Sequence, residues 1–399
     1  MGTSGRRTVR DLRRGNRAML LRALYFGGPA SRNELSAATG LSPATVSTMT
    51  ADLLAGNVIA EAGQVDSDGG RPRVLLKVNP DYGYAVGVDV GETQVKVELF
   101  DLEMRERARA HYAVRSAKHD PELVARHILA GVDAVIAEGE VPPERVLGVG
   151  VGVPGIVEPG PGGVVRAKTF GWREVPLGAL LRAGTALSRP MPPLYVDNGA
   201  KTMGQAELWF GSGKGTRDAI IVLMGSGVGG TVVTDGAIYR GAGKAAGEVG
   251  HLKIVAGGRA CRCGARGCLE AYLGAEAILD RAGVVADSAD EESALARLLD
   301  EGSPVIGESV ELLGAGLSSL VHLFNPERIV IGGWAGLMLG GRLLAEIRAA
   351  TAANTQLQPF QPETVVLGRL GPDAVALGAA TLVLEPFFRE AALSAPAIA

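Results

Sequence analysis

The sequence predicts an α/β protein in which a small, mainly helical N-terminal domain precedes two glycine-rich lobes. Helical periodicity governs residues 16–54, whereas apolar strands separated by glycine turns begin at Tyr84. Residues 85–100 and 219–234 share a strand, turn and strand form, which indicates an internal duplication. The 399 residues are 47% hydrophobic and include 57 glycines, which suits two or three domains with large cores and many tight turns.

Three helices are predicted before residue 55. The first covers residues 16–27. The second begins after Ser31, with Glu34 completing a capping box, because the serine hydroxyl and the glutamate carboxylate each satisfy a backbone N–H. A short turn containing Gly40 leads to a third helix over residues 42–54. Two helices joined by a three-residue glycine turn are the signature of a helix-turn-helix.

A wing is predicted after the third helix. The short strands Val58–Glu61 and Arg73–Val78 are joined by the polar loop 66–72. In a winged helix-turn-helix the second helix of the motif enters the DNA major groove, and the wing touches the backbone or the minor groove. The candidate DNA contacts lie at the start of that helix, on the wing and on the preceding helix, and are Arg32, Ser42, Pro43, Ala44, Thr45, Ser47, Thr48 and Arg71.

Charge supports a DNA partner. Residues 1–35 hold eight arginines against Asp11 and Glu34, a net charge of +6, although the whole chain carries −3. Such an asymmetry indicates an anionic partner at the N-terminus, and residues 1–15 are expected to form a flexible basic tail. The alternative is a protein-interaction module of three helices with a solvated basic tail. The wing and the charge together favour double-stranded DNA.

The glycine-rich body predicts two lobes with a cleft between them. This is the architecture of the actin-like, or ribonuclease H-like, sugar kinases, in which glycine turns bring backbone N–H groups close to nucleotide phosphates. The two turns here are residues 89–94 and 225–230. Each turn alone is a weak signal, because glycine hairpins are common in ordinary β structure.

All three cysteines, Cys261, Cys263 and Cys268, fall within eight residues, and His251 precedes them. Three thiolates and an imidazole make a closed tetrahedral zinc site that leaves no position for a catalytic water. The spacing therefore predicts a structural Zn²⁺. The alternative is a loop with free buried thiols.

The expected location is the cytoplasm. No charged segment followed by an apolar stretch and a cleavage site is found at the start, and no run of 18 apolar residues predicts a membrane span. Cysteines clustered with a histidine, rather than spread as a disulfide framework, fit a reducing compartment.

From about residue 16 to 385 the chain resembles the ROK family of repressors, open reading frames and kinases. The resemblance rests on four motifs of the family, which are Gly247-Glu248-Val249-Gly250-His251, Cys261 to Glu270, the turn 225–230 and Asn325-Pro326-Glu327. In addition, Gly70-Arg71-Pro72 in the wing is similar to the repressor branch of the family, which includes the xylose and N-acetylglucosamine repressors. It implies that His251 and the three cysteines hold one zinc. It also implies that a sugar is bound by Asn198, Glu248, His251 and Glu270.

Two departures from the family's kinases matter. Those kinases have an Asn-Asp pair whose aspartate is the general base, and here Asn198 is followed by Gly199, which accepts no proton. In the first phosphate turn, Glu92 places a negative charge where phosphates would approach. We therefore expect no enzyme activity. The residues left from a nucleotide site are Asp89, Gly91, Thr93, Gly225 and Gly227.

The expected function is a sugar-responsive transcriptional regulator, a repressor of carbohydrate metabolism genes. Its partners would be a DNA operator, a small sugar or sugar-phosphate effector, and further copies of itself in a homodimer or homotetramer. The alternatives are an active ATP-dependent sugar kinase with an appended DNA-binding domain, and a regulator controlled by a protein partner. The expected layout is a tail at 1–15, a winged helix-turn-helix at 16–80, a first lobe at 81–198 plus about 379–396, and a second lobe with the zinc site at 199–378.

Overall fold

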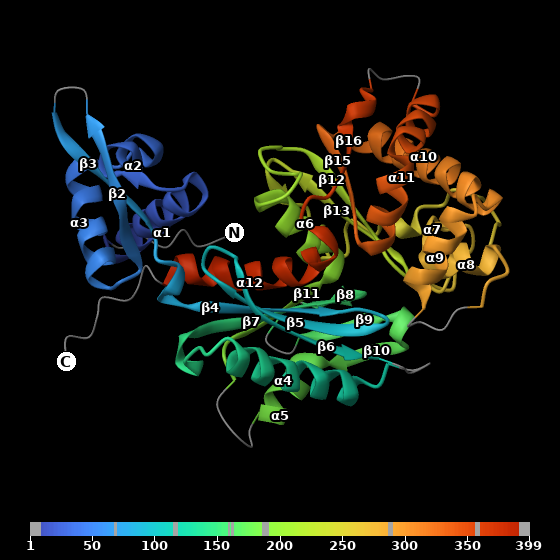
Figure 1. Cartoon of the computed structure of the whole chain (residues 1–399), viewed down its shortest axis with the longest axis horizontal. Coiled ribbons are helices and arrows are strands. Elements are labelled where there is room, and N and C mark those ends of the chain that lie inside the picture. The colour runs from blue at the N-terminus through green and yellow to red at the C-terminus, as the bar shows by residue number, and fades with distance from the viewer. Residues whose placement is uncertain are drawn as a thin grey trace, which may run out of the picture.

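The computed structural model describes residues 9–67, 70–114, 119–158, 160, 163–185, 191–285, 290–355 and 360–390. Figure 1 shows a small N-terminal domain at one end of the molecule and two larger sheets that face each other across a pair of helices, α6 and α12. The predicted α/β class, with a helical domain ahead of two glycine-rich lobes, is confirmed.

The N-terminal domain contains the three predicted helices. Helix α1 covers Val9–Gly27, so residues 9–15 are helical, and the prediction of a flexible tail over them is wrong. Charge alone does not exclude a helix there, because arginine is a good helix former. Residues 1–8 lie outside the described part of the chain. Helices α2 (Arg32–Thr39) and α3 (Pro43–Ala55) complete the set.

Local capping chemistry sets the ends of α2 and α3. Ser31 accepts from the backbone N–H of Glu34, and the Glu34 carboxylate accepts from the backbone N–H of Ser31, so the predicted capping box is confirmed. Gly40 ends α2 with φ of 70°, a left-handed conformation that favours glycine. Ser42 caps α3 by accepting from the N–H of Thr45. These caps produce the sharp turn between the two helices.

The wing is longer than predicted. Strands β2 (Ile59–Ser67) and β3 (Gly70–Val78) pair antiparallel from Ile59 opposite Val78 up to Ser67 opposite Gly70, and β1 (Ala30–Ser31) joins the other edge of β3. Residues 62–67 and 70–73 therefore continue the ladder, because backbone pairing does not require apolar side chains. Asp68 and Gly69, and the side chain of the predicted DNA contact Arg71, lie outside the described residues.

The first lobe is built on a five-stranded sheet in the order β11-β7-β4-β5-β6. A smaller three-stranded sheet, β10-β9-β8, lies beside it. The strands of both sheets are β4 (Tyr84–Val90), β5 (Gln94–Asp101), β6 (Glu106–Ala113), β7 (Val146–Val153), β8 (Ile156–Val157), β9 (Val164–Ala167), β10 (Trp172–Pro176) and β11 (Leu194–Asn198). Helices α4 (Pro121–Glu138) and α5 (Leu177–Thr185) cover one face of the large sheet, and α12 (Ala374–Glu390) covers the other (Figure 1).

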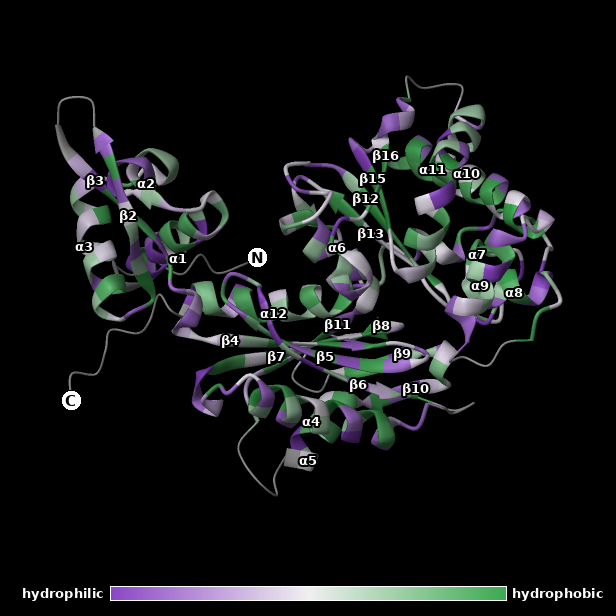
Figure 2. Ribbon diagram, in the orientation of Figure 1, coloured by the Kyte–Doolittle hydropathy of each residue, from purple (hydrophilic) through white to green (hydrophobic). Residues whose placement is uncertain are grey.

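The second lobe is built on a second five-stranded sheet, in the order β14-β13-β12-β15-β16. Its strands are β12 (Ala219–Met224), β13 (Val228–Thr234), β14 (Ala237–Ile238), β15 (Arg328–Gly332) and β16 (Val365–Leu367). Its helices are α6 (Gly199–Trp209), α7 (Glu270–Leu273), α8 (Ala275–Arg281), α9 (Glu291–Asp300), α10 (Pro304–Phe324) and α11 (Trp334–Ala353). In Figure 2 hydrophobic residues concentrate in the strands of this sheet and in the helices beside it.

The two large sheets have the same topology. In each, the first strand in the chain, β4 or β12, pairs antiparallel with the next strand on one side and parallel with a later strand on the other. The third strand then extends the antiparallel edge, and the last extends the parallel edge. The internal duplication predicted from the two strand-turn-strand segments is thus present in the fold.

Helices α6 and α12 form the layer between the sheets. Helix α12 packs on β4 and β7, where a Cβ at Gly87 or Gly150 would overlap a carbonyl oxygen of α12. Helix α6 packs on β12 and β13, and the two helices pack on each other. A Cβ at Gly378 of α12 would overlap the carbonyl oxygen of Thr202 of α6. The lobes therefore meet through close backbone contacts that tolerate no side chain.

Helix α10 is long and apolar enough to cross a membrane by length and composition alone. Within the fold, 56% of its apolar window is buried, and the helix packs against α11 and the short helices of the second lobe. This burial is typical of a core helix.

We predict that Gly378→Ala lowers the free energy of unfolding by about 1–3 kcal/mol, because the new Cβ meets backbone that has little room to move. The matched control is Gly341→Ala, also in a helix but in open space, which is expected to stabilise by about 0.5–1 kcal/mol through helix propensity. Denaturant unfolding measures both. Equal behaviour of the two variants would show that α6 and α12 are not closely packed.

Candidate functional site

The three cysteines and His251 gather at one point of the second lobe. His251 ends the short 3-10 turn Val249–His251, and the cysteines follow on one loop. One ligand atom from each of the four residues lies within 4.8 Å of the others. The Sγ atoms of Cys263 and Cys268 are 3.7 Å apart, and Cys261 Sγ lies 3.8 Å from Nδ1 of His251. Zn–S bonds of about 2.3 Å give tetrahedral edges of about 3.8 Å, so these residues fit a zinc ion.

A lysine lies beside the thiols. The Lys253 ammonium donates to Cys268 Sγ at 2.7 Å, and this hydrogen bond raises the pKa of Lys253. Three thiolates around a divalent ion leave a net charge of about −1, which a neighbouring ammonium offsets. The loop itself turns through Gly264 and Gly267, with φ of 88° and 76°.

Asn198 ends β11 and caps α6. Its Oδ1 accepts from the backbone N–H of Lys201 at 3.1 Å, and its Nδ2 donates to the Gly155 carbonyl at 2.7 Å. An amide can make two further hydrogen bonds beyond these. The side chain is therefore held by α6 and by the loop after β7, while part of its hydrogen-bonding capacity remains.

Glu248 and His251 lie next to each other in a partly buried setting. Burial raises the pKa of the Glu248 carboxyl, while His251 and Lys201 act on it in the opposite direction. Lys201 is 3% exposed, and burial lowers the pKa of its ammonium, which donates to the backbone carbonyl of Lys244. A buried lysine in this position was not predicted from the sequence.

Glu270 lies close to the metal cluster. Its Oε2 accepts from the backbone N–H of Val228 at 3.1 Å, and its Oε1 lies 3.6 Å from Cys261 Sγ. It also acts electrostatically on Glu248. The structure thus brings Glu248, His251 and Glu270 together around the cysteine loop, and Lys201 links this group to Asn198.

The position after Asn198 has room for a side chain. A Cβ at Gly199 would make ordinary van der Waals contact with Val375 and Val153. The preceding Asp197 is engaged elsewhere, because its Oδ2 pairs with Arg240 at 2.6 Å and its Oδ1 accepts from the N–H of Asn198. Neither Gly199 nor Asp197 therefore presents an unpaired carboxylate next to Asn198.

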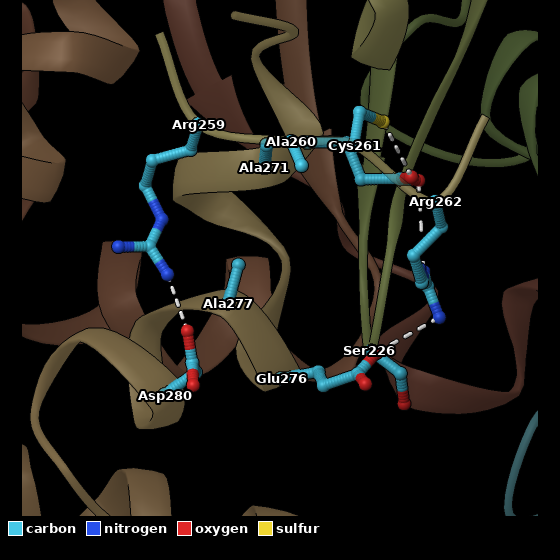
Figure 3. Close-up of a pocket in the computed structure, with 10 residues that line it drawn as sticks. Ser226, Arg259, Ala260, Cys261, Arg262, Ala271, Glu276, Ala277 and Asp280 are labelled. Atoms are coloured by element: carbon cyan, nitrogen blue, oxygen red, sulfur yellow. Dashed lines mark hydrogen bonds and ion pairs between the residues drawn. The ribbon is translucent and has the colours of Figure 1, made fainter. Parts of the chain in front are cut away.

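The two glycine turns of the lobes meet at Arg262. This residue lies between two of the cysteines and donates to Glu92 of the first turn, with Nη1 to Oε2 at 2.5 Å and Nη2 to Oε1 at 3.1 Å. In the second turn, a Cβ at Gly227 would crowd Arg262 and Glu270. Figure 3 shows Arg262 on one side of a cavity, where it also reaches Glu276 at 3.0 Å, and Arg259 pairing with Asp280 on the other side.

The remaining nucleotide-site candidates lie in the same two turns. Gly91 donates from its N–H to the carbonyl of Gln94, and Gly225 donates to the carbonyl of Gly227, so both turns are closed by their own backbone. Burial raises the pKa of Asp89 to about 6. Thr93 follows Glu92 in the first turn, and the Glu92 carboxylate accepts hydrogen bonds from Arg262.

A second contact crosses the cleft. The Lys168 ammonium of the first lobe donates to the backbone carbonyl of Cys263 at 2.7 Å. The cysteine loop is therefore attached to the first lobe at two points, through Lys168 and through Glu92. Sequence reasoning missed both contacts. The position of Arg262 between two cysteines was visible, but its partner Glu92 is 170 residues away in the chain.

The predicted DNA contacts on α3 share one exposed face. Ser42, Pro43, Ala44, Ser47 and Thr48 are exposed, and Thr45 is half-buried, whereas Val46, Met49 and Leu53 are buried in the domain core. Arg32 lies behind this helix, where its Nε donates to Thr50 Oγ1 at 3.0 Å. The structure brings the α3 residues together on one surface and ties Arg32 to its inner side.

This fold, two duplicated lobes around a cleft with a helical domain attached, defines the class of two-lobed sugar kinase-like proteins. The model of the ROK family matches residues 85–386, and the chain belongs to the ROK family. The xylose repressor of Caldicellulosiruptor bescii is 31% identical over 94% of this chain and 96% of its own length.

Two solved structures agree with this assignment. A ROK family transcriptional regulator, described as a homolog of the E. coli MLC protein, matches 96% of this chain and 98% of its own with a TM-score of 0.74 at 23% identity. A ROK family glucokinase from Streptomyces griseus, in complex with glucose and AMPPNP, matches 76% of this chain and all of its own with a TM-score of 0.63 at 26% identity.

We predict that Cys263→Ser abolishes tight zinc binding and lowers the midpoint of thermal unfolding by at least about 4 °C, because a closed four-ligand site loses one thiolate. Metal content by mass spectrometry and a thermal melt with and without a chelator measure this. Ala265→Ser, in the same loop but without loss of a ligand, is the control. A metal-free wild-type protein that ignores added zinc would contradict the prediction.

We predict a coupling energy of about 1 kcal/mol between Glu92 and Arg262, because the pair is bidentate and less than a third exposed. A double-mutant cycle of Glu92→Gln and Arg262→Gln in denaturant unfolding measures it. The control cycle is Arg217 with Asp235, whose side chains are 74% and 84% exposed, and its coupling should be close to zero. A coupling near zero at Glu92 and Arg262 would mean that the pair does not hold the lobes together.

Proposed function

We propose that this protein is a sugar-responsive transcriptional regulator, a repressor of carbohydrate metabolism genes, that has no kinase activity. The observation that carries the proposal is the site at the start of α6. Asn198 is held in place by two hydrogen bonds, whereas the next position is Gly199 and the preceding Asp197 is paired with Arg240. A general base is required to take the proton of a sugar hydroxyl, so binding remains without phosphoryl transfer.

The sugar would be bound by Asn198, Glu248, His251 and Glu270. Several fixed acceptors and donors are what a polyhydroxyl ligand requires. The Nδ1 atom of His251 faces Cys261 at 3.8 Å, so its other ring nitrogen is available for a ligand. Zn²⁺ held by His251, Cys261, Cys263 and Cys268 would be structural, and it would orient this imidazole.

The cleft also supports the loss of nucleotide binding. Arg262 lies at the meeting point of the two glycine turns, and its guanidinium is paired with Glu92. A nucleoside triphosphate would have to separate this ion pair and bring its negatively charged phosphates close to the Glu92 carboxylate. The residues Asp89, Gly91, Thr93, Gly225 and Gly227 are then the remains of a phosphate site whose place is taken by an ion pair.

Double-stranded operator DNA would be bound by the exposed face of α3 and by the wing. The xylose repressor relative matches the chain over nearly its full length, including the N-terminal domain, whereas the glucokinase matches 76% of it. Ser42, Thr45, Ser47 and Thr48 offer hydroxyls to phosphates and base edges. A cytoplasmic homodimer or homotetramer would place two such helices about 34 Å apart on a palindromic site.

We predict that the purified protein selects specific fragments of genomic DNA. Its affinity for these fragments should change by at least about fivefold when one sugar of a panel is added. The panel is D-xylose, D-glucose, N-acetyl-D-glucosamine and their phosphates, and fluorescence anisotropy measures the affinity. Asn198→Ala should weaken the sugar response and leave sugar-free DNA binding unchanged. A protein that selects DNA but responds to none of the sugars would favour control by a protein partner.

The matched controls for kinase activity are Gly199→Asp and Gly199→Asn. The two side chains have the same shape, and their Cβ would make only ordinary contacts here, but only the aspartate accepts a proton. An ATP-coupled assay should show no turnover of the panel sugars by the wild type. Turnover by the wild type would overturn the proposal in favour of an active sugar kinase with an appended DNA-binding domain.

A further inference from the structure

The N-terminal domain shares a hydrophobic core with the first lobe. Leu20, Leu21 and Leu24 of α1 are fully buried, and they belong to one cluster with Leu384 and Phe388 of α12. A domain on a flexible linker would bury its own core separately. The N-terminal domain instead packs directly on α12.

Next to this core, the C-terminal end of α6 meets α1 through aromatic rings. The ring of Phe26 lies 5.0 Å from the ring of Trp209 in an edge-to-face arrangement, and 6.5 Å from that of Phe210. Tyr25 contacts Phe210 at 6.4 Å. Such pairs add about 0.5–1.5 kcal/mol each beyond their buried area and have defined geometry, so they resist small rotations.

A single arginine joins all three helices at this junction. The guanidinium of Arg22 on α1 lies 5.5 Å from the Phe26 ring centroid, 5.8 Å from that of Trp209 on α6 and 5.4 Å from that of Phe388 on α12. It also pairs with Glu385 of α12 at 2.9 Å. Cation–π attraction and the ion pair both depend on the relative placement of the helices.

The other end of α6 is the candidate sugar site. Asn198 is the N-cap of α6, and Lys201 lies in its first turn. The helix has 11 residues, about 16 Å at 1.5 Å per residue, and most of its side chains are buried between the sheets. A short, buried helix moves as a rigid body, so a displacement at Asn198 also displaces Trp209.

The junction is not filled completely. A pocket there is lined from both domains, by Tyr25 and Phe26 on one side and by Trp209, Phe210 and Glu103 on the other. The buried hydroxyl of Tyr25 has no hydrogen-bond partner among the residues that the structure describes. The contact between α1 and α6 is therefore less closely packed than a protein interior, in which such spaces are few.

We propose that α6 transmits the state of the sugar site to the DNA-binding domain, and that Phe26, Trp209 and Arg22 are the positioning residues of this coupling. The proposal rests on the proposed function, because it requires a sugar that changes DNA affinity. Lobe closure on a sugar moves the Asn198 end of α6, the Trp209 end moves with it, and α1 follows through the aromatic contacts. The orientation of α3 on its operator changes as a result.

The test is the ratio of operator affinities with and without saturating sugar, using the DNA fragment and the panel sugar that act on the wild type. In Phe26→Leu this ratio should fall by at least about fivefold towards one. Sugar affinity without DNA, and DNA affinity without sugar, should each stay within about twofold. Arg22→Gln should act in the same direction, and it keeps the apolar core intact if Phe26→Leu proves unstable.

The matched control is Phe387→Leu. Phe387 is 5% exposed in the same shared core and contacts Tyr82 and Phe388, and no ring contact joins it to α6 in the described residues. Its ratio should equal that of the wild type. If Phe26→Leu and Arg22→Gln keep the wild-type ratio, or if Phe387→Leu loses it equally, α6 is not the coupling element. A wild type without any sugar response would instead overturn the proposed function, and this proposal with it.

Discussion

The close packing of α6 against α12 is the constraint on which the rest of the structure depends. Each helix lies on the inner face of one sheet, and they touch where Gly378 meets the Thr202 backbone. Any movement of one lobe relative to the other therefore requires α6 to slide or tilt against α12. The same pair reaches the DNA-binding domain, since α12 contributes Phe388 to its core and α6 ends at Trp209. One helix layer thus contacts both the cleft and the N-terminal domain.

In the cleft, an ion pair lies where the two glycine turns meet. In sugar kinases of this fold, two glycine turns bring backbone N–H groups close to the phosphates of a nucleotide. Here a carboxylate, Glu92, is built into the first turn, and a guanidinium, Arg262, reaches it from the opposite lobe. The ion pair is intramolecular, so it needs no free nucleotide to form. Because Arg262 lies between two cysteines, a metal in this loop would stiffen the arm that carries it.

The cysteine loop makes contacts in both lobes. It lies beside Glu248 and Glu270, and it contacts the first lobe through Lys168 and Arg262. A rigid loop of this kind connects the candidate sugar site to the opposite side of the cleft. The relatives agree with a division of labour in which the lobes are shared with glucokinases, whereas the N-terminal domain is shared with the xylose repressor.

The sequence by itself determined the local elements and the chemistry of single motifs. Capping residues located α2 and α3, because a serine hydroxyl acts on backbone only three residues away. The spacing of the cysteines indicated a metal site, and the repeated strand-turn-strand segments indicated two lobes, since both are short-range patterns. The glycine at position 199, where the family's kinases carry an aspartate, was likewise visible in the sequence. The helical start at Val9 was missed because charge was weighed above helix propensity.

Only the tertiary structure decided which distant residues meet. Arg262 and Glu92 are 170 residues apart, and Arg22 and Glu385 are separated by 363. The sequence around a charged residue does not indicate which distant residue it will pair with, because Coulomb attraction acts through space and not along the chain. The buried position of Lys201 and the aromatic junction at Trp209 depend in the same way on how two sheets and two helices pack. Local hydrogen bonding can be predicted from neighbouring residues, whereas the contacts between the lobes and the N-terminal domain form only once the chain has folded.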